Sequence, residues 1–209
     1  MIRICLALAM LLLTGAVMAA DEPPHQILVE DGDIQIRLYE PQILAEVEVA
    51  GRMSSASGRG FGPLANYIFG GNQSRDGASQ DIAMTTPVTQ TRSQEIAMTT
   101  PVTQSAAGHD RWRVAFIMPA EWTMETLPVP DDPRVDIREL PARMMATIRF
   151  SGGPNARRFM RHETELRAWL DMNEMEIIGE PVYARYDPPW VPTPFRRNEV
   201  MIEIANPQS

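Results

Sequence analysis

The most constraining feature of this chain is an internal similarity between two stretches that begin 101 residues apart. Residues 34–51, IQIRLYEPQILAEVEVAG, align without a gap with residues 135–152, VDIRELPARMMATIRFSG, and most apolar positions coincide. The identical pairs are Ile36 with Ile137, Arg37 with Arg138, Ala45 with Ala146, and Gly51 with Gly152. Each stretch contains two strand patterns, ends in glycine and precedes a helical pattern, which indicates a duplicated half-domain. We expect the halves to pair into one antiparallel barrel that hides most sheet edges, with a helix packed on each half.

Local patterns place further strands. Apolar residues alternate on both sides of Asp31-Gly32, which predicts a hairpin with a tight turn at that pair. Mostly alternating patterns predict strands over residues 43–49 and 111–119.

Two helices are predicted. The first follows a Gly/Ser stretch and ends before Gly70-Gly71. Four of its apolar residues recur at helical spacing: Phe61, Leu64, Ala65 and Ile68. The second helix is longer and is predicted from about Asn155 to Asn173.

The phrase SQDIAMTTPVTQ at residues 79–90 returns almost unchanged as SQEIAMTTPVTQ at residues 93–104. Its 14-residue period is shorter than that of a solenoid unit, which needs about 20 residues or more. The copies therefore fit two strands, or one strand and a returning arm. The proline in each copy lacks the N–H that a sheet ladder needs, so pairing should stop there or lie at a sheet edge. The copies are either a simple tandem duplication or a means of placing Met84 or Met98 beside an apolar ligand.

Residues 1–20 form a separate N-terminal segment. Arg3 precedes an uncharged apolar run, and small residues up to Ala20 precede Asp21, which is the pattern of a secretory signal peptide. The run is short for a membrane span, which needs about 20 residues, although an uncleaved anchor is the alternative. We expect residues 21–209 to fold as one domain that is periplasmic or secreted and not membrane-bound after cleavage. The mature chain has no cysteine, so its core must hold it without disulfides.

All 19 basic residues are arginine, and 27 acidic residues bring the formal charge to −8. This acidity gives no overall attraction to nucleic acid or to an anionic membrane face. An arginine near a pocket, by contrast, offers a planar fork that pairs well with a carboxylate. The mature sequence has no cysteine nucleophile, no Gly-x-Ser-x-Gly turn, no phosphate-binding loop and no zinc-type His/Cys spacing, so we do not expect an enzyme.

Several motifs in combination resemble the SOUL haem-binding protein family. They are FGPLANYIFGGN (61–72), the doubled IAMTTPV, WRVAFIMP (112–119), LPVPDDPRVDIRELP (127–141) and YARYDPPWVPTPFRRNEV (183–200). The resemblance covers about residues 25–205. It implies an α+β fold, with a distorted eight-stranded antiparallel β-barrel flanked by two helices and built from two similar halves. It also implies reversible, non-covalent binding of haem or another tetrapyrrole.

The resemblance places the tetrapyrrole in an apolar groove beside the first helix and the late proline-rich loop, residues 187–195. The candidate cofactor-binding residues are Phe61, Leu64, Ala65, Ile68, Trp190, Phe195, Arg196 and Arg197. The two arginines could pair with haem propionates, or with Glu199 or Glu203 of their own strand. The apolar helix residues could instead be core, and the loop tryptophan could cover the open end of the barrel. The glycines around the first phenylalanine would let a flat ligand approach the backbone.

His162 is the candidate iron ligand, because it borders the apolar face of the second helix, although a histidine there also suits simple packing. His25 lies in the N-terminal segment and His109 in a polar stretch. The resemblance does not imply an axial histidine, so haem held by apolar contact and propionate pairing is an alternative. A methionine of the repeated phrase, or Tyr67, would then be a weak ligand.

Two other functions fit the same residues. A tetrapyrrole-modifying enzyme that removes or exchanges the metal would need a proton donor beside the groove, such as Tyr67 or His162. A small-molecule effector-binding module that does not use haem is the other, because similar barrels form the effector-binding domains of some bacterial transcription regulators. We expect a monomer whose partner is haem or another tetrapyrrole, and not nucleic acid.

Overall fold

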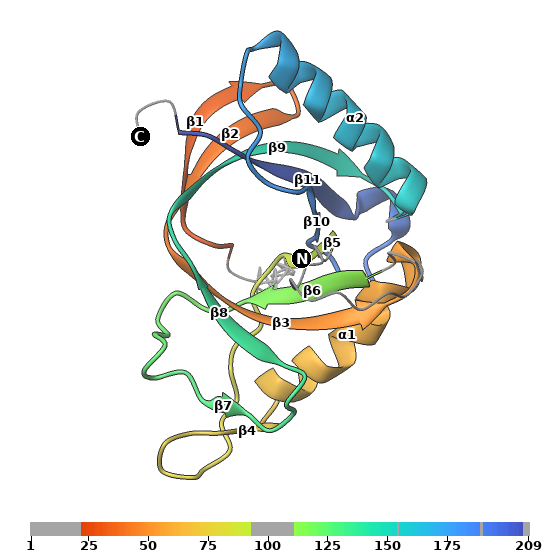
Figure 1. Cartoon of the computed structure of the whole chain (residues 1–209). Coiled ribbons are helices and arrows are strands. Elements are labelled where there is room, and N and C mark those ends of the chain that lie inside the picture. Colours follow the sequence, from red (N-terminus) through yellow and green to blue (C-terminus); the bar gives the residue numbers. More distant parts are fainter. Residues whose placement is uncertain (1–21, 93–110, 154, 189, 207–209) are drawn as a thin grey trace, which may run out of the picture.

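The computed structural model describes residues 22–92, 111–153, 155–188 and 190–206. The expected signal segment, the second copy of the repeated phrase and His109 lie outside the described residues. Within this part of the chain, two α-helices flank one large curled sheet, which makes an α+β fold (Figure 1).

Each half of the chain follows the same order of main elements: two strands, a helix and two further strands. The main sheet contains β1 (His25–Asp31), β2 (Ile34–Tyr39), β3 (Gln42–Ala50), β5 (Val88–Arg92), β6 (Arg111–Ile117), β8 (Asp136–Leu140), β9 (Arg143–Ser151), β10 (Val182–Arg185) and β11 (Arg197–Ile204). The helices are α1 (Met53–Ile68), α2 (Ala156–Met172) and the short 3-10 helix η1 (Thr193–Phe195). A separate two-stranded ribbon pairs β4 (Asn72–Gln73) with β7 (Val129–Pro130).

The main sheet is antiparallel and open. Its nine strands run in the order β1-β2-β9-β11-β10-β5-β6-β3-β8 and curl into a half-barrel. The expectation of a closed, eight-stranded barrel is therefore wrong in both strand number and closure. The additional strand is β1, which folds back on β2 through the predicted hairpin. Asp31 pairs with Ile34, so the two turn residues are Gly32 and Asp33, one position later than the predicted Asp31-Gly32 pair. Strand β1 covers the free edge of β2 and becomes an edge itself, and no ladder among the described residues joins it to β8.

The predicted duplication is confirmed by strand order and by register. Without β1, exchanging β2 with β8, β3 with β9, β5 with β10 and β6 with β11 reverses the strand order and keeps every neighbour. The register is equivalent as well, because Ile36 pairs with Ala146 and Ile137 pairs with Ala45. A pseudo-two-fold axis therefore passes between the central strands β5 and β10.

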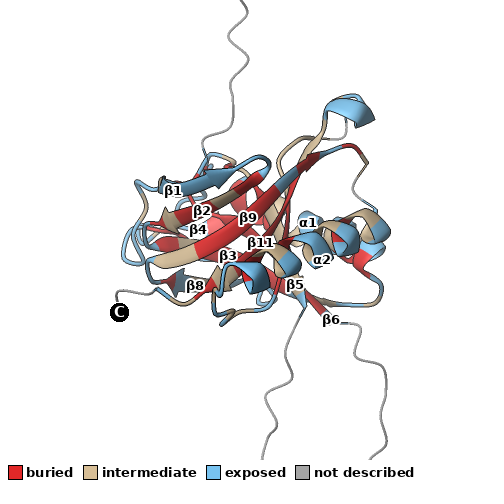
Figure 2. Ribbon diagram, turned by 90° about the horizontal axis from the view of Figure 1, so that it is seen from above, coloured by how far each residue is buried: buried red, intermediate tan, exposed pale blue. Residues whose placement is uncertain are grey.

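Each helix covers the outer, convex face of one half of the sheet (Figure 1). Under α2 the core includes Ile36, Ile148, Phe159, Leu166 and Val200. Under α1 it includes Ala45, Val47, Leu64, Tyr67 and Phe116. Figure 2 shows the outlying strand β1 exposed along its length, whereas the strands beside it are largely buried. The two largest clusters of buried apolar side chains among the described residues therefore lie between the helices and the convex face of the sheet.

The first helix begins earlier than the sequence pattern indicates. The Gly/Ser stretch before Phe61 is helical from Met53 onward. Glycine and serine are poor helix formers, and tertiary packing overrides that preference here. Ala56 and Gly60 are both buried, and a Cβ at Gly60 would lie 2.5 Å from the Cβ of Val114. Small residues at these two positions let the helix lie close against β6.

The second helix matches its prediction. Asn155 is the N-cap, and its side chain accepts a hydrogen bond of 2.9 Å from the backbone N–H of Arg158. This contact satisfies one of the unpaired N–H groups at the start of the helix. Phe159, Leu166 and Leu170 form its buried stripe.

The first copy of the repeated phrase lies along the α1 core and then enters the sheet. Ile82 is buried in this core and Met84 packs against it, while the Thr85 hydroxyl donates to the carbonyl of Ile117. Strand β5 begins at Val88, directly after Pro87. Core packing thus accounts for the apolar residues of this copy.

Candidate functional site

The outward face of α1 carries little charge and little bulk. The helix contains no acidic residue and a single arginine, Arg59, whose guanidinium donates to the backbone carbonyl of Ala50. A Cβ added at Gly58 or Gly62 would meet no atom within 4 Å. At both positions the helix backbone is therefore open to a ligand.

Two phenylalanines border this open backbone. Phe61 is 40% exposed, and its ring packs edge-on against Phe116 of β6 with centroids 5.4 Å apart. Phe69, the C-cap residue, is 64% exposed. Residues 58, 62 and 69 are four and seven positions apart, so they follow one line along the helix surface. We refer to Gly58, Phe61, Gly62 and Phe69 as the α1 platform.

Phe69 was not among the residues predicted from the sequence, although its seven-residue spacing from Gly62 is visible in the chain. Phe69 directly precedes Gly70, which marks the end of the helix in the sequence. It therefore lies beyond the residues over which an apolar helical pattern is expected. The lack of acidic residues over 53–68 is a second signal that the sequence contains.

The other candidates from α1 do not belong to this outward face. Leu64 and Ile68 are fully buried in the core between the helix and the sheet, and Ala65 is half-buried. The space beside Gly60 is also occupied, because this glycine packs closely against Val114 of the protein's own sheet. The structure therefore leaves Phe61 as the member of the predicted helix set with a substantial outward surface.

The proline-rich loop between β10 and β11 belongs to the other half of the molecule. Trp190 is 83% exposed and Phe195 is 75% exposed. The carbonyl of Arg196 accepts a 2.9 Å hydrogen bond from the N–H of Gly152, which precedes α2, and its Nε donates to a carbonyl of the same loop. The loop is thus anchored beside the start of α2, whereas Phe61 lies on α1.

Arg197 belongs to a buried ion cluster on the concave face of the sheet. The Glu199 carboxylate accepts two hydrogen bonds from Arg37, of 2.8 and 3.0 Å, two from Arg197, of 2.7 and 3.1 Å, and one of 2.5 Å from the Tyr186 hydroxyl. Burial alone would raise the pKa of Glu199, but the hydrogen bonds and charge of Arg37 outweigh it and lower this pKa. Arg197 also pairs with Glu22. The alternative that Arg197 pairs within its own strand is therefore confirmed.

His162 is half-buried on α2 and already fully engaged. Its ring stacks on Phe150 at 4.1 Å with an interplanar angle of 18°. Its Nδ1 lies 3.2 Å from the carboxylate of Glu165, and its Nε2 lies 3.2 Å from the guanidinium of Arg161. Burial, and next the charge of Arg161, lowers the pKa of His162. Coordination of iron would require the ring to give up one of these two partners.

The remaining candidate ligands also have partners in the fold. Tyr67 is fully buried, and its hydroxyl donates a 2.8 Å hydrogen bond to the carbonyl of Pro128. Burial raises the pKa of Tyr67 above its ordinary value. Its hydroxyl is therefore a poor proton donor to a ligand on the surface of α1.

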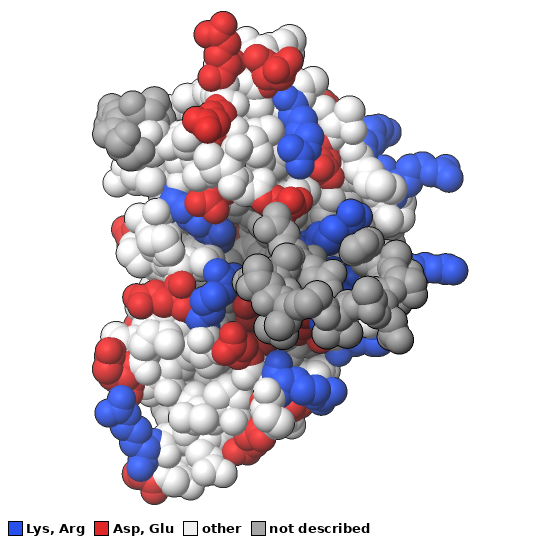
Figure 3. Space-filling model, viewed as in Figure 1, with Lys and Arg blue, Asp and Glu red and all other residues white. Residues whose placement is uncertain are grey.

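On the face of the molecule shown in Figure 3, acidic side chains and arginines lie interspersed. The described residues contain no cluster of three or more His, Cys, Asp or Glu side chains suited to a metal ion. In the same part of the chain, no helix is long and apolar enough to cross a membrane.

The curled sheet with two outer helices defines a known class of fold. The C-terminal domain of EcmrR matches with a TM-score of 0.60 at 10% identity, over 87% of this chain and 98% of that one. A protein described as a hydrolase, encoded by lin2189 of Listeria innocua, matches with a TM-score of 0.54 at 11% identity, over 85% of this chain and 94% of that one. At these identities the likeness shows the fold alone. No curated protein matched the sequence.

The family is shown by sequence. The model of the SOUL heme-binding protein family matches residues 20–203, which is most of the chain. The protein therefore belongs to the SOUL heme-binding protein family, as its motifs predicted.

Proposed function

We propose that this protein is an exported tetrapyrrole-binding protein that holds haem non-covalently on the α1 platform. The observation that carries the proposal is the combination of two open glycines and two exposed phenylalanines on a helix without acidic residues. An anionic macrocycle meets no like charge on this helix, although the chain as a whole carries −8. Family membership supports haem as the ligand.

Apolar contact would supply most of the affinity. Each 100 Å² of macrocycle face removed from water contributes about 2.5 kcal/mol, offset by the loss of freedom on association. Phe61 suits this role because its ring is already held against Phe116 and loses little freedom when a ligand binds. Arg52, exposed at the N-cap, and Arg59 are the cations of this helix that could pair with propionates.

Bound haem would supply a flat apolar face and an iron atom, and the described residues beside it offer little to ligate the iron. Both nitrogens of His162 already have partners, and Tyr67 is buried. We therefore expect the absorbance spectrum of the hemin complex to be unchanged in His162→Ala. A shift of the Soret band in that variant would instead establish His162 as a ligand.

A hemin titration of residues 21–209, followed by absorbance, tests the platform. Gly58→Gln and Gly62→Gln place a side chain on the open backbone, and each should weaken hemin binding about tenfold. Gly58→Gln also replaces a poor helix former, so it should stabilise the fold by about 0.5–1 kcal/mol. Gly62→Gln lacks this gain, because its new Cβ meets the ring of Pro63. Loss of binding in a more stable protein cannot be attributed to unfolding.

Met160→Gln is the matched control, since Met160 is exposed on α2 and receives the same side chain. Hemin should bind this variant as it binds the unaltered protein. Unchanged binding in both glycine variants would reject the α1 platform and direct attention to the loop that carries Trp190 and Phe195.

The exported location rests on the signal-peptide pattern. Expression of the full chain with its own first twenty residues should yield a mature protein that begins at Asp21 in the periplasmic or culture fraction. The N-terminal mass of the purified protein gives the result, and retention of Met1 would favour an uncleaved anchor.

A further inference from the structure

A small cavity lies on the concave face of the sheet, on the side away from both helices, and both halves of the molecule line it. Its volume is about 70 Å³. Four pairs of equivalent positions face it: Leu44 and Met145, Ala115 and Met201, Thr89 and Val182, and Gln42 and Arg143. The cavity therefore lies on the pseudo-two-fold axis, where residues far apart in the sequence meet.

The charged lining of this cavity is unbalanced. Its ionisable arginines and carboxylates are Arg113, Arg138, Arg143 and Glu46, which gives a formal charge of +2. Glu46 is shared by Arg138, at 3.0 Å, and Arg113, at 3.6 Å. Among the described residues, Arg143 has no carboxylate within 4 Å. The local excess of positive charge contrasts with the acidity of the whole chain.

Burial lowers the pKa of Arg143, and the charges of Glu203 and Tyr39 only partly oppose this effect. Arg143 is half-buried, its Nε is shielded from solvent, and its guanidinium has no direct counter-ion among the described residues. Such an arrangement is unfavourable unless a further group compensates the charge.

Two buried donors next to the cavity have no acceptor among the described residues. They are the side-chain nitrogen of Gln42, a residue that is 7% exposed, and Nε of Arg143. These side chains meet each other only through a long contact of 3.4 Å, from Nη2 of Arg143 to Oε1 of Gln42. An acceptor with negative charge is the group that would satisfy both donors and balance the guanidinium.

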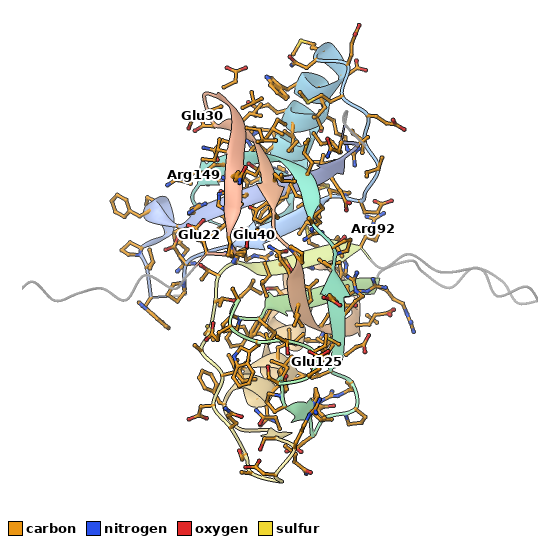
Figure 4. The ribbon with its side chains drawn as sticks, turned by 90° about the vertical axis from the view of Figure 1, so that its left-hand side faces the viewer. Glu22, Glu30, Glu40, Arg92, Glu125 and Arg149 are labelled. Atoms are coloured by element: carbon orange, nitrogen blue, oxygen red, sulfur yellow. The ribbon has the colours of Figure 1, made fainter. Side chains whose placement is uncertain are left out.

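A larger chamber of about 310 Å³ adjoins the cavity, and Pro23, Gln42 and Ile117 line both. Most of its other lining is apolar: Pro24, Pro41, Ile43, Met118, Pro119, Ala120 and Trp122. Thr85, Glu121 and Glu22 also border this chamber, and Glu22 is paired with Arg197. Figure 4 shows Glu22 and Glu40 at the level where the two halves of the sheet meet. The chamber is of the size that binds small molecules, whereas the inner cavity has room for only a few atoms.

We propose that the concave face binds the carboxylate of an apolar organic acid. The carboxylate occupies the inner cavity and accepts hydrogen bonds from Arg143 and Gln42, and the apolar body lies in the outer chamber against its prolines, Met118 and Trp122. A free acid and a propionate of a tetrapyrrole share this chemistry. The inference concerns a different face from the α1 platform and does not depend on it.

Calorimetric titration of residues 21–209 with octanoate tests the site, with 1-octanol as the uncharged comparison. Octanoate should bind, and 1-octanol should bind at least tenfold more weakly. Arg143→Met should reduce octanoate affinity at least tenfold. Gln42→Glu should abolish the binding, because it supplies the missing carboxylate from the chain itself.

Thermal unfolding separates loss of the site from loss of the fold. Arg143→Met removes a half-buried charge that lacks a direct counter-ion, so the melting temperature should stay the same or rise. Gln42→Glu should raise it by pairing with Arg143. Arg111→Met is the control, since Arg111 lies on the same sheet outside the cavity and forms an exposed pair with Glu48. This variant should bind octanoate normally.

Hemin and its dimethyl ester distinguish the two sources of the carboxylate. Octanoate binding that hemin does not displace identifies a free acid as the ligand. Displacement by hemin but not by the ester, with weaker hemin binding in Arg143→Met, identifies the propionate. If neither octanoate nor hemin binding depends on Arg143, the proposal is wrong. Failure of the haem proposal would appear separately, as hemin binding that is absent while octanoate binding persists.

Discussion

The two halves of the sheet place an arginine at the same position and give it different partners. Arg37 of β2 binds Glu199 of β11, whereas its equivalent Arg138 of β8 binds Glu46 of β3. The position on β6 that corresponds to Glu199 carries Arg113, so charge is reversed there. On the α2 half the buried charges close into one complete cluster, while on the α1 half Arg138 and Arg113 share one carboxylate, that of Glu46.

This difference distinguishes the positions that maintain the fold from the positions that form a candidate site. Both halves keep the same strand register and bury apolar residues on the convex face, which each helix requires. The concave positions have no helix to accommodate, so their side chains differ between the halves without loss of the fold. The set of charges is incomplete at the axis, so a ligand that binds there stabilises the structure most.

The largest expected effect comes from removing the carboxylate of each half. Glu199→Leu leaves the buried Arg37 without a carboxylate and leaves Arg197 with Glu22 alone, so it should destabilise the protein by about 3–5 kcal/mol. Glu46→Leu should cost less, about 1–3 kcal/mol, because Arg138 and Arg113 are partly exposed and can be hydrated. Urea unfolding of the two variants measures the difference. Equal losses would contradict the distinction between a closed and an open cluster.

A smaller effect tests how the α1 half is packed. Gly60→Ala forces a Cβ to within 2.5 Å of Val114 and should destabilise the protein by about 1–3 kcal/mol. Gly58→Ala, two residues earlier and in open space, should stabilise it by about 0.5–1 kcal/mol. Opposite signs in thermal unfolding would confirm that α1 touches the sheet on one side only.

The closed cluster also predicts an acid limit to stability. Burial alone would raise the pKa of Glu199, but its arginine partners lower it below the ordinary value of 4.5. A lowered folded-state pKa means that this group stabilises the fold above about pH 4.5 and that the contribution is lost as the pH falls through the folded-state pKa. Urea unfolding from pH 7 to pH 3 should therefore show a steeper loss for the unaltered protein than for Glu199→Gln. Parallel curves would mean that other carboxylates set the acid limit.

The smallest effect concerns the exposed loop of the α2 half. Trp190→Ser and Phe195→Ser should each change the free energy of unfolding by less than about 0.5 kcal/mol, because both rings are largely exposed. Chemical denaturation gives the value. A loss above 1 kcal/mol would show that these rings pack against a part of the molecule outside the described residues.

Much of the architecture could be predicted because it depends on neighbouring residues. The β1–β2 hairpin, the capped helix after Asn155 and the duplication follow from spacing along the chain. The candidate site was harder to predict. Leu64, Ile68 and Phe61 share the same apolar pattern, and a pattern cannot tell which of them faces the sheet. The early start of α1 was also not predicted. Gly60 lies in this helix because it allows close packing on Val114, and not because glycine favours a helix locally.

By itself, the sequence determined the repeated strand–strand–helix unit and its apolar alternation, because these rest on short-range spacing and on the periods of strands and helices. Only the tertiary structure decided that the sheet stays open, which carboxylate each arginine meets, and that Gln42 and Arg143 face each other across the axis. Those outcomes depend on strand order and register between residues about one hundred positions apart, and local spacing contains no information about either.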